Sequence, residues 1–328
     1  MSSDSHPIAP ATAERPSPVV MAEVVEEALS HPQREVRPPR RWLPLLLFAA
    51  TCLTTFGTYA AMDLALAVDA REASLEAIRD EAWLAVKNGL YYSAAVMTIL
   101  ICHEMGHFLQ ARRYRVRASL PYFIPLPLPP LGTMGAVIVM ESRIANRRAL
   151  FDIGISGPLA GLVPTLIFCV IGVQLSTVEE FRPQNADFQI GAPLLFRELV
   201  ARFSGPIPEG FVLSLHPIAF AGWVGLFLTS LNLIPVGQLD GSHVLYAMIR
   251  RRAHWVAWGF IGAVVSLMFL MRGPMLNWIP LLLLLLVMGP AHPPTSNDRE
   301  PLGLGRYILG ALTLAFIIVG FTPQPLKM

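Results

Sequence analysis

The chain has 328 residues, of which 54% are hydrophobic and only 15% are charged, and its mean hydropathy is +0.52. Soluble domains carry about 25% charged residues, so this composition indicates a membrane protein. The formal net charge of +2 and the lack of a basic stripe interleaved with aromatic residues argue against a nucleic-acid partner. The three cysteines, Cys52, Cys102 and Cys169, lie in apolar runs without CxxC spacing, which argues against a disulfide framework and a cysteine-based zinc site.

Residues 1–41 are rich in Pro, Ala, Ser and Glu and show no apolar periodicity long enough to form a core. We therefore expect a disordered tail here, followed by a membrane-embedded domain over residues 42–328. The glutamates of this tail count against an acid-poor organelle transit peptide.

Long apolar stretches fill the rest of the chain. Most of them reach the roughly 20 residues that a helix needs to cross a bilayer, while the last three are shorter. The sequence thus predicts an all-α polytopic membrane protein with about six to seven transmembrane helices. The stretches cover residues 43–68, 86–111, 150–175, 213–236, 254–271, 275–290 and 305–322.

The distribution of basic residues sets the expected orientation. If the N-terminus is cytosolic, the arginine clusters at 112–117, 143–148 and 250–252 all fall on the cytosolic side, together with the arginines of the tail. Because short cytosolic loops are enriched in Lys and Arg, we expect the N-terminus in the cytosol and the C-terminus on the opposite side.

Two stretches depart from the helical pattern. Residues 118–141 are apolar but rich in proline, so they cannot form a spanning helix. The glycines and the β-prone run within them predict a re-entrant, hairpin-like loop that dips in from the cytosolic side, close to the polar residues at 103–107. Residues 176–212 predict a polar loop on the opposite side, with a short amphipathic helix at 193–203.

The residues His103-Glu104-Met105-Gly106-His107 match the pattern HExxH. On a helix, the two histidines share one face and can bind one metal ion, while the glutamate beside them can accept a proton from a water that the metal activates. Two buried, structurally paired histidines are the alternative. That alternative is weakened because these polar residues lie within an apolar span, where ionisable side chains are costly and usually functional.

A catalytic zinc ion needs a third protein ligand, and Asp240 is the best candidate. It ends the fourth apolar stretch, and helical rise places it about 15 Å from Arg250, whereas His103 is about 13 Å from Arg112. The two positions thus lie at similar depths below the same basic face. A helix cap is the alternative role for Asp240, with His243 as an uninvolved neighbour.

These motifs together resemble the site-2 protease family of intramembrane metalloproteases, in particular its members without a PDZ domain from bacteria and plastids. The resemblance covers roughly residues 86–295. It rests on HExxH, on Asn-x-x-Pro-x-x-x-Leu-Asp-Gly at 232–241 and on Gly157-Pro-Leu-Ala-Gly161. The turn at 132–136, the run 146–152 and His292-Pro-Pro agree with it.

The resemblance implies an intramembrane zinc endopeptidase that cuts a transmembrane segment of a membrane-protein substrate. It implies that zinc is bound by His103, His107 and Asp240, that Glu104 is the general base, and that Asn232 holds the substrate or the developing oxyanion. A multi-pass protein of a bacterial cytoplasmic membrane is the expected setting. We assign no chemistry to Gly157 and Gly161, whose spacing suits close helix packing, and we expect His292 to be a loop residue.

Three other functions are compatible with parts of the pattern. A membrane zinc transporter could also place histidines and an aspartate at mid-depth, but it would not need Glu104 directly after His103. A catalytically silent membrane scaffold would not need both motifs intact. A membrane-anchored zinc protease acting on soluble peptides would carry HExxH in a soluble domain, which the apolar surroundings of His103 oppose.

Overall fold

The computed structural model describes residues 42–67, 74–140, 146–180, 189–270, 278–289, 295 and 297–327. These residues all belong to one compact unit of the chain, residues 41–328. The expected tail at 1–41 and His292 lie outside the described ranges.

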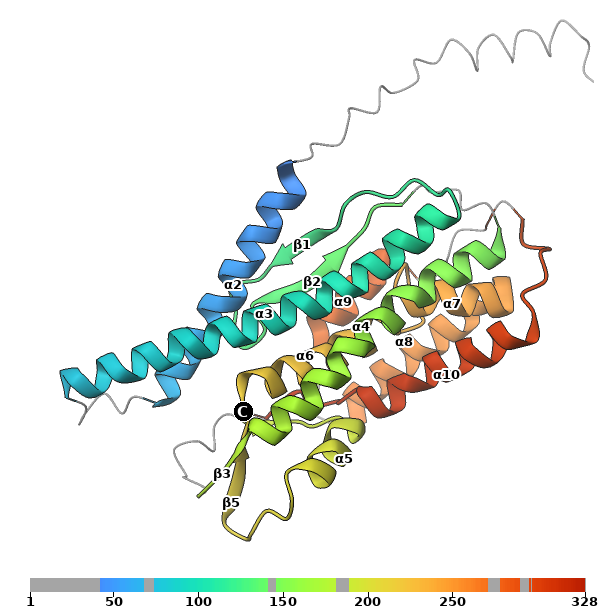
Figure 1. Ribbon diagram of the computed structural model, residues 1–328. Helices are drawn as coiled ribbons and strands as arrows, with labels where there is room; N and C mark the ends of the chain where they lie inside the picture. The colour runs from blue at the N-terminus through green and yellow to red at the C-terminus, as the bar shows by residue number, and fades with distance from the viewer. Residues whose placement is uncertain are drawn as a thin grey trace, which may run out of the picture. The chain divides into compact units, whose positions relative to one another are not determined.

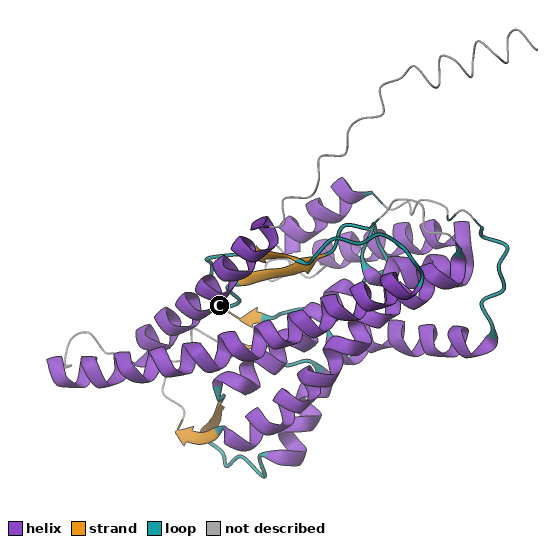
Figure 2. Cartoon of the chain, turned by 45° about the horizontal axis from the view of Figure 1, so that its top comes forward, coloured by secondary structure: helices purple, strands orange, loops and turns teal. Residues whose placement is uncertain are grey.

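Helices dominate the described chain (Figure 2). In chain order they are α2 (Trp42–Ala67), α3 (Leu75–Arg113), α4 (Arg147–Leu175), α5 (Leu194–Phe203), α6 (Pro217–Asn232), α7 (Asp240–Ile249), α8 (Ala253–Leu270), α9 (Ile279–Met288) and α10 (Leu304–Gly320). A 3-10 turn, η2 (Arg250–Arg252), joins α7 to α8 without an intervening loop, and the positive φ of 57° at Arg250 breaks the helical backbone there.

Four segments within the described ranges are long and apolar enough to cross a membrane: Trp42–Ala67, Leu75–Arg113, Arg147–Leu175 and Asp240–Leu270. Two further helices, α6 and α10, are apolar but shorter. The polytopic all-α class is therefore confirmed, with four helical segments of full spanning length among the described residues.

Side-chain caps define where the two central helices begin. The Ser74 side chain accepts a hydrogen bond from the Ala77 amide, so α3 starts well before its apolar run and is longer than hydropathy predicted. The Asn146 side chain caps α4 in the same way, accepting from the Ala149 amide at 2.8 Å. These caps satisfy amides that the first turn of a helix leaves without a partner. The helices α3 and α4 then run side by side (Figure 1).

The proline-rich stretch forms the expected hairpin. Strand β1 (Tyr122–Pro125) pairs antiparallel with β2 (Thr133–Val137), and Ala118 bridges Met140 at the base. Near the tip, the Tyr92 hydroxyl of α3 donates to the Leu131 carbonyl at 2.7 Å. Since Tyr92 lies roughly 30 Å along the axis from the end of α3, the hairpin extends past the depth of His103.

Two small sheets lie at the opposite end of the helices from the base of the hairpin. Strand β3 (Thr177–Glu180) pairs with β5 (Phe211–Ser214), and β4 (Gln189–Ile190) pairs with β6 (Leu326–Lys327). The β4–β6 pair joins the C-terminal end of the chain to the loop after α4. The amphipathic helix expected at 193–203 is confirmed as α5.

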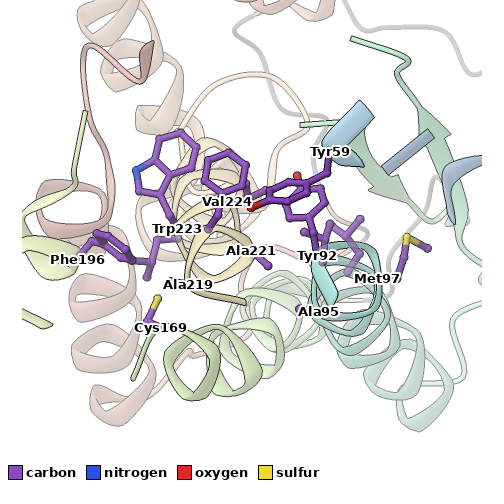
Figure 3. Packing of buried hydrophobic residues seen from close by; sticks show 14 of the residues in the cluster. Tyr59, Tyr92, Ala95, Met97, Cys169, Phe196, Ala219, Ala221, Trp223 and Val224 are labelled. Atoms are coloured by element: carbon purple, nitrogen blue, oxygen red, sulfur yellow. The ribbon is translucent and has the colours of Figure 1, made fainter. Parts of the chain in front are cut away.

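An aromatic cluster fills the space between α2, α3 and α6 (Figure 3). The rings of Tyr59 and Tyr92 stack at 4.6 Å between centroids, and Phe220 stacks on Trp223 at 5.5 Å. The Trp223 indole donates to the Gly191 carbonyl at 2.9 Å, so its one polar atom is satisfied although it is buried. This cluster holds α6, and therefore Asn232 at its end, against α3.

Candidate metal centre

The two histidines of the HExxH motif lie on the side of α3 that faces α4 and α7. Both are buried, with 5% of His103 and 4% of His107 exposed, and Glu104 between them is 3% exposed. One helical turn separates the histidines, and their Nε2 atoms are 3.2 Å apart. The Nε2 atoms of the two rings therefore point toward one position between them.

Asp240 reaches the same point from another helix. Its Oδ2 atom is 3.1 Å from His103 Nε2, and its Oδ1 atom is 3.2 Å from His107 Nε2. The three candidate ligand atoms all lie within 4.8 Å of one another. The third ligand expected from the sequence thus joins the two histidines.

The placement of Asp240 differs from the expectation in one respect. The fourth apolar stretch does not continue as a helix to Asp240, because α6 ends at Asn232 and Asp240 is the first residue of α7. Gly241 lies so close to the Leu233 backbone that a Cβ atom would collide with the Leu233 carbonyl. The chain can therefore fold back here only with glycine after the aspartate, which brings Asp240 next to the end of α6.

Asn232 also lies at the centre. Its amide nitrogen is 3.4 Å from His103 Nε2, so the last residue of α6 borders the three ligand atoms. The structure thus brings together the site residues that the sequence suggested: His103, Glu104, His107, Asn232 and Asp240.

A backbone carbonyl of α4 orients His107. The Nδ1–H of His107 donates to the Ile153 carbonyl at 2.7 Å, so Nε2 is the ring nitrogen that can bind a metal. Metal-ligating histidines usually hold their second nitrogen in this way. The sequence offered no signal for this contact, because any residue could supply the carbonyl.

The glycines of Gly157-Pro-Leu-Ala-Gly161 make room for the histidines. A Cβ atom on Gly157 would collide with His107 Nε2, and one on Gly161 would lie 3.0 Å from His103 Cβ. Gly106 of α3 likewise packs closely against α4, since a Cβ atom there would collide with the Ser156 carbonyl. The expected close packing of the two helices is therefore present, and it shapes the centre directly. Gly157 and Gly161 have the same four-residue spacing as His103 and His107, and this match was the sequence signal that could have predicted their contact.

We expect Gly157→Ala to weaken metal binding by about 10- to 100-fold, the usual cost of disturbing the groups that orient a ligand. The new methyl group would displace the nitrogen that His107 presents. Zinc affinity measured by chelator competition checks this, with Gly259→Ala as the control because a Cβ there meets no atom within 4 Å. Equal affinities in the two variants would contradict it.

The donor set suits a catalytic divalent metal. Two imidazole nitrogens and one carboxylate are typical protein ligands of zinc, and three such ligands leave a position for water or substrate. The hydrogen bond that fixes the His107 ring, and the space that Gly157 and Gly161 leave for the two histidines, indicate a metal site and not a chance approach of polar groups. The residues therefore fit a zinc ion.

Comparisons with known proteins agree with this geometry. The model of "Peptidase family M50" matches residues 91–272, a range that contains the whole centre. "Probable zinc metalloprotease EGY1, chloroplastic" of Arabidopsis thaliana is 31% identical over 237 residues, which cover 70% of this chain and 42% of that protein. The EGY1 protein of Oryza sativa subsp. japonica is 32% identical over 252 residues, covering 74% and 41%. The EGY2 protein of Arabidopsis thaliana is 27% identical over 304 residues, covering 90% and 52%.

The chain thus spans about two fifths to one half of the length of these curated relatives. No solved structure matches it. The relatives are named as chloroplastic, so they lend no support to the expected bacterial cytoplasmic membrane. The resemblance to the site-2 protease family is confirmed, and the chain belongs to peptidase family M50.

Proposed function

We propose that this protein is an intramembrane zinc endopeptidase that hydrolyses a peptide bond within or near a transmembrane segment of another membrane protein. One observation carries the proposal: His103 and His107, inside a helix long enough to span a bilayer, converge with Asp240 beside Glu104. The names of the curated relatives, which are zinc metalloproteases, support the choice of metal.

A zinc ion held by the three ligands would polarise a peptide carbonyl and make a water molecule easier to deprotonate. Glu104 then acts as the general base, since its carboxylate is buried next to both histidines and can accept the proton of that water. The Asn232 amide can donate a hydrogen bond to the oxyanion that forms on the substrate, because it borders His103. His107 keeps its orientation through the Ile153 carbonyl.

We further propose that the N-terminus faces the cytosol. The arginine-rich ends of α3, α4 and η2 lie on one side of the spans, as the contacts of Arg147 with the end of α7 and of Tyr114 with α4 indicate. The positive-inside rule assigns that side to the cytosol, or to the equivalent compartment of an organelle.

The substrate has to expose its scissile carbonyl, because a transmembrane helix engages its carbonyls in its own hydrogen bonds. We propose that an unwound segment pairs with the free edge of the β1–β2 hairpin, which in the described residues is a two-stranded sheet. Met134 and Val137 of β2, and Val139 just after it, are all about half exposed or more, and these apolar side chains suit an apolar substrate strand.

Comparison of membrane-protein fragments from cells that make the wild-type chain or Glu104→Gln would test this function. We expect fragments ending within transmembrane segments to appear only with the wild-type chain. Zinc flux into proteoliposomes without any such fragments would instead identify a transporter. Identical fragments in both cell lines would contradict the proposed protease.

A further inference from the structure

Asp152, in the second turn of α4, connects two other helices. The Tyr114 hydroxyl at the end of α3 donates to Asp152 Oδ2 at 2.5 Å. The Arg306 guanidinium of α10 donates to both carboxylate oxygens, from Nε to Oδ1 at 2.7 Å and from Nη2 to Oδ2 at 2.8 Å. Such bidentate, charge-assisted pairs have a defined geometry as well as strength. The Asp152 side chain is 16% exposed, so water competes little for it.

The residue after Asp152 supplies the carbonyl that orients His107. Tyr114 follows His107 by two helical turns and therefore lies on the same side of α3. Two contacts from one side of α3 thus fall on two consecutive residues of α4, first on Asp152 and then on Ile153. A shift of α4 that breaks one of them also disturbs the other.

Arg147, the first residue of α4, makes a second set of contacts, with α7, the helix that begins with Asp240. Arg147 is 3% exposed and donates from Nη2 to the Met248 carbonyl at 2.6 Å and to the Tyr307 hydroxyl at 2.6 Å. Its Nε also donates to the Ala247 carbonyl. These carbonyls end α7, the helix that begins with Asp240. Two consecutive residues of α10 therefore contact α4: Arg306 binds Asp152, next to the carbonyl that orients His107, and Tyr307 binds Arg147, which contacts α7.

The close contacts of Gly157 and Gly161 make the placement of the two histidines depend on the position of α4. Gly157 leaves no room for a Cβ atom against His107, and Gly161 leaves little against His103, so α4 cannot move closer to α3 without displacing these histidines. We propose that Asp152, held by Tyr114 and Arg306, is a positioning residue for the metal centre, fixing α4 where the Ile153 carbonyl orients His107. This inference rests on the proposed function. It also makes α10, which lies beyond the residues that the family model matches, part of the support of the centre.

Cobalt binding to the purified full chain would test the role of Asp152. Asp152→Asn should weaken Co²⁺ affinity by about 10- to 100-fold, as expected for an outer-shell partner, and should alter the visible absorption of the bound Co²⁺. Tyr114→Phe and Arg306→Gln should act in the same direction. The double variant Asp152→Asn/Arg306→Gln should bind no more weakly than Asp152→Asn alone, because both changes break one contact.

Arg148→Gln is the matched control. Arg148 lies on the same helix and face, where it pairs with Glu300 at 3.1 Å and donates to the Pro301 carbonyl, but it has no contact with Asp152. Its loss should leave Co²⁺ affinity and absorption unchanged. Tyr114→Phe removes only a hydroxyl, so it keeps the test valid if Asp152→Asn does not fold.

Two results would overturn the inference: wild-type Co²⁺ binding and absorption in Tyr114→Phe and Asp152→Asn, or an equal loss in Arg148→Gln. His107→Ala separates this failure from that of the proposed function. If His107→Ala keeps wild-type Co²⁺ affinity, the centre itself is wrongly assigned.

Discussion

Replacing Glu104 by Gln is expected to reduce peptide hydrolysis by about 10²- to 10⁴-fold, the usual contribution of a general base. Gln has nearly the same shape but cannot accept the proton of the attacking water. Because Glu104 is not one of the three ligands, zinc should remain bound at the wild-type level. Cleavage of a single-span substrate in proteoliposomes and zinc content by mass spectrometry measure the two quantities on the same preparation.

Glu76→Gln is the appropriate control for this experiment, since Glu76 lies on the same helix but is exposed in its first turn. It should cleave at the wild-type rate. Full activity in Glu104→Gln would show that another group accepts the proton. Loss of zinc together with activity would show that Glu104 supports the centre structurally.

Replacing Asp240 by Ala should remove zinc and activity together. The change leaves two histidines as ligands, and we expect zinc affinity to fall by more than about 100-fold, because loss of a ligand exceeds the 10- to 100-fold cost of losing an outer-shell partner. Zinc retained after dialysis against a chelator measures the effect.

Asp63→Ala controls for the loss of an aspartate from a helix interface. Asp63 accepts a hydrogen bond from Asn88 at 2.9 Å between α2 and α3, away from the centre. This variant should keep its zinc. Zinc retention in Asp240→Ala would mean that Asp240 caps α7 without binding metal, the alternative that the sequence left open.

Hydropathy predicted most of the helices because the spans are long and apolar, and the bilayer leaves little other choice of structure. It missed the polar first part of α3, where the Ser74 cap and exposed charges extend the helix beyond its apolar run. It also placed one continuous stretch over 213–236, whereas the chain stops being helical after Asn232. That break depends on the contact of Gly241 with Leu233, which no local pattern reveals.

The centre was predictable as far as its chemistry requires particular side chains. HExxH and Asp240 are recognisable because imidazoles and carboxylates are costly in an apolar span. The supporting contacts were not predictable for two different reasons. Ile153 acts through its backbone, and Asp152 finds its partner Arg306 more than 150 residues away in sequence.

The β1–β2 hairpin has a consequence for the supply of one reactant. Proteolysis consumes a water molecule at every turnover, and hydrocarbon chains provide almost none. Irregular backbone at membrane depth persists only where protein or a hydrated cavity satisfies its polar groups. The hairpin extends from the end of α3 to Tyr92, past the level of His103, and its outer strand edges are unpaired in the described residues. On the proposed function, the hairpin that receives a substrate strand is also the element along which we expect water from the arginine-rich side to reach the metal centre.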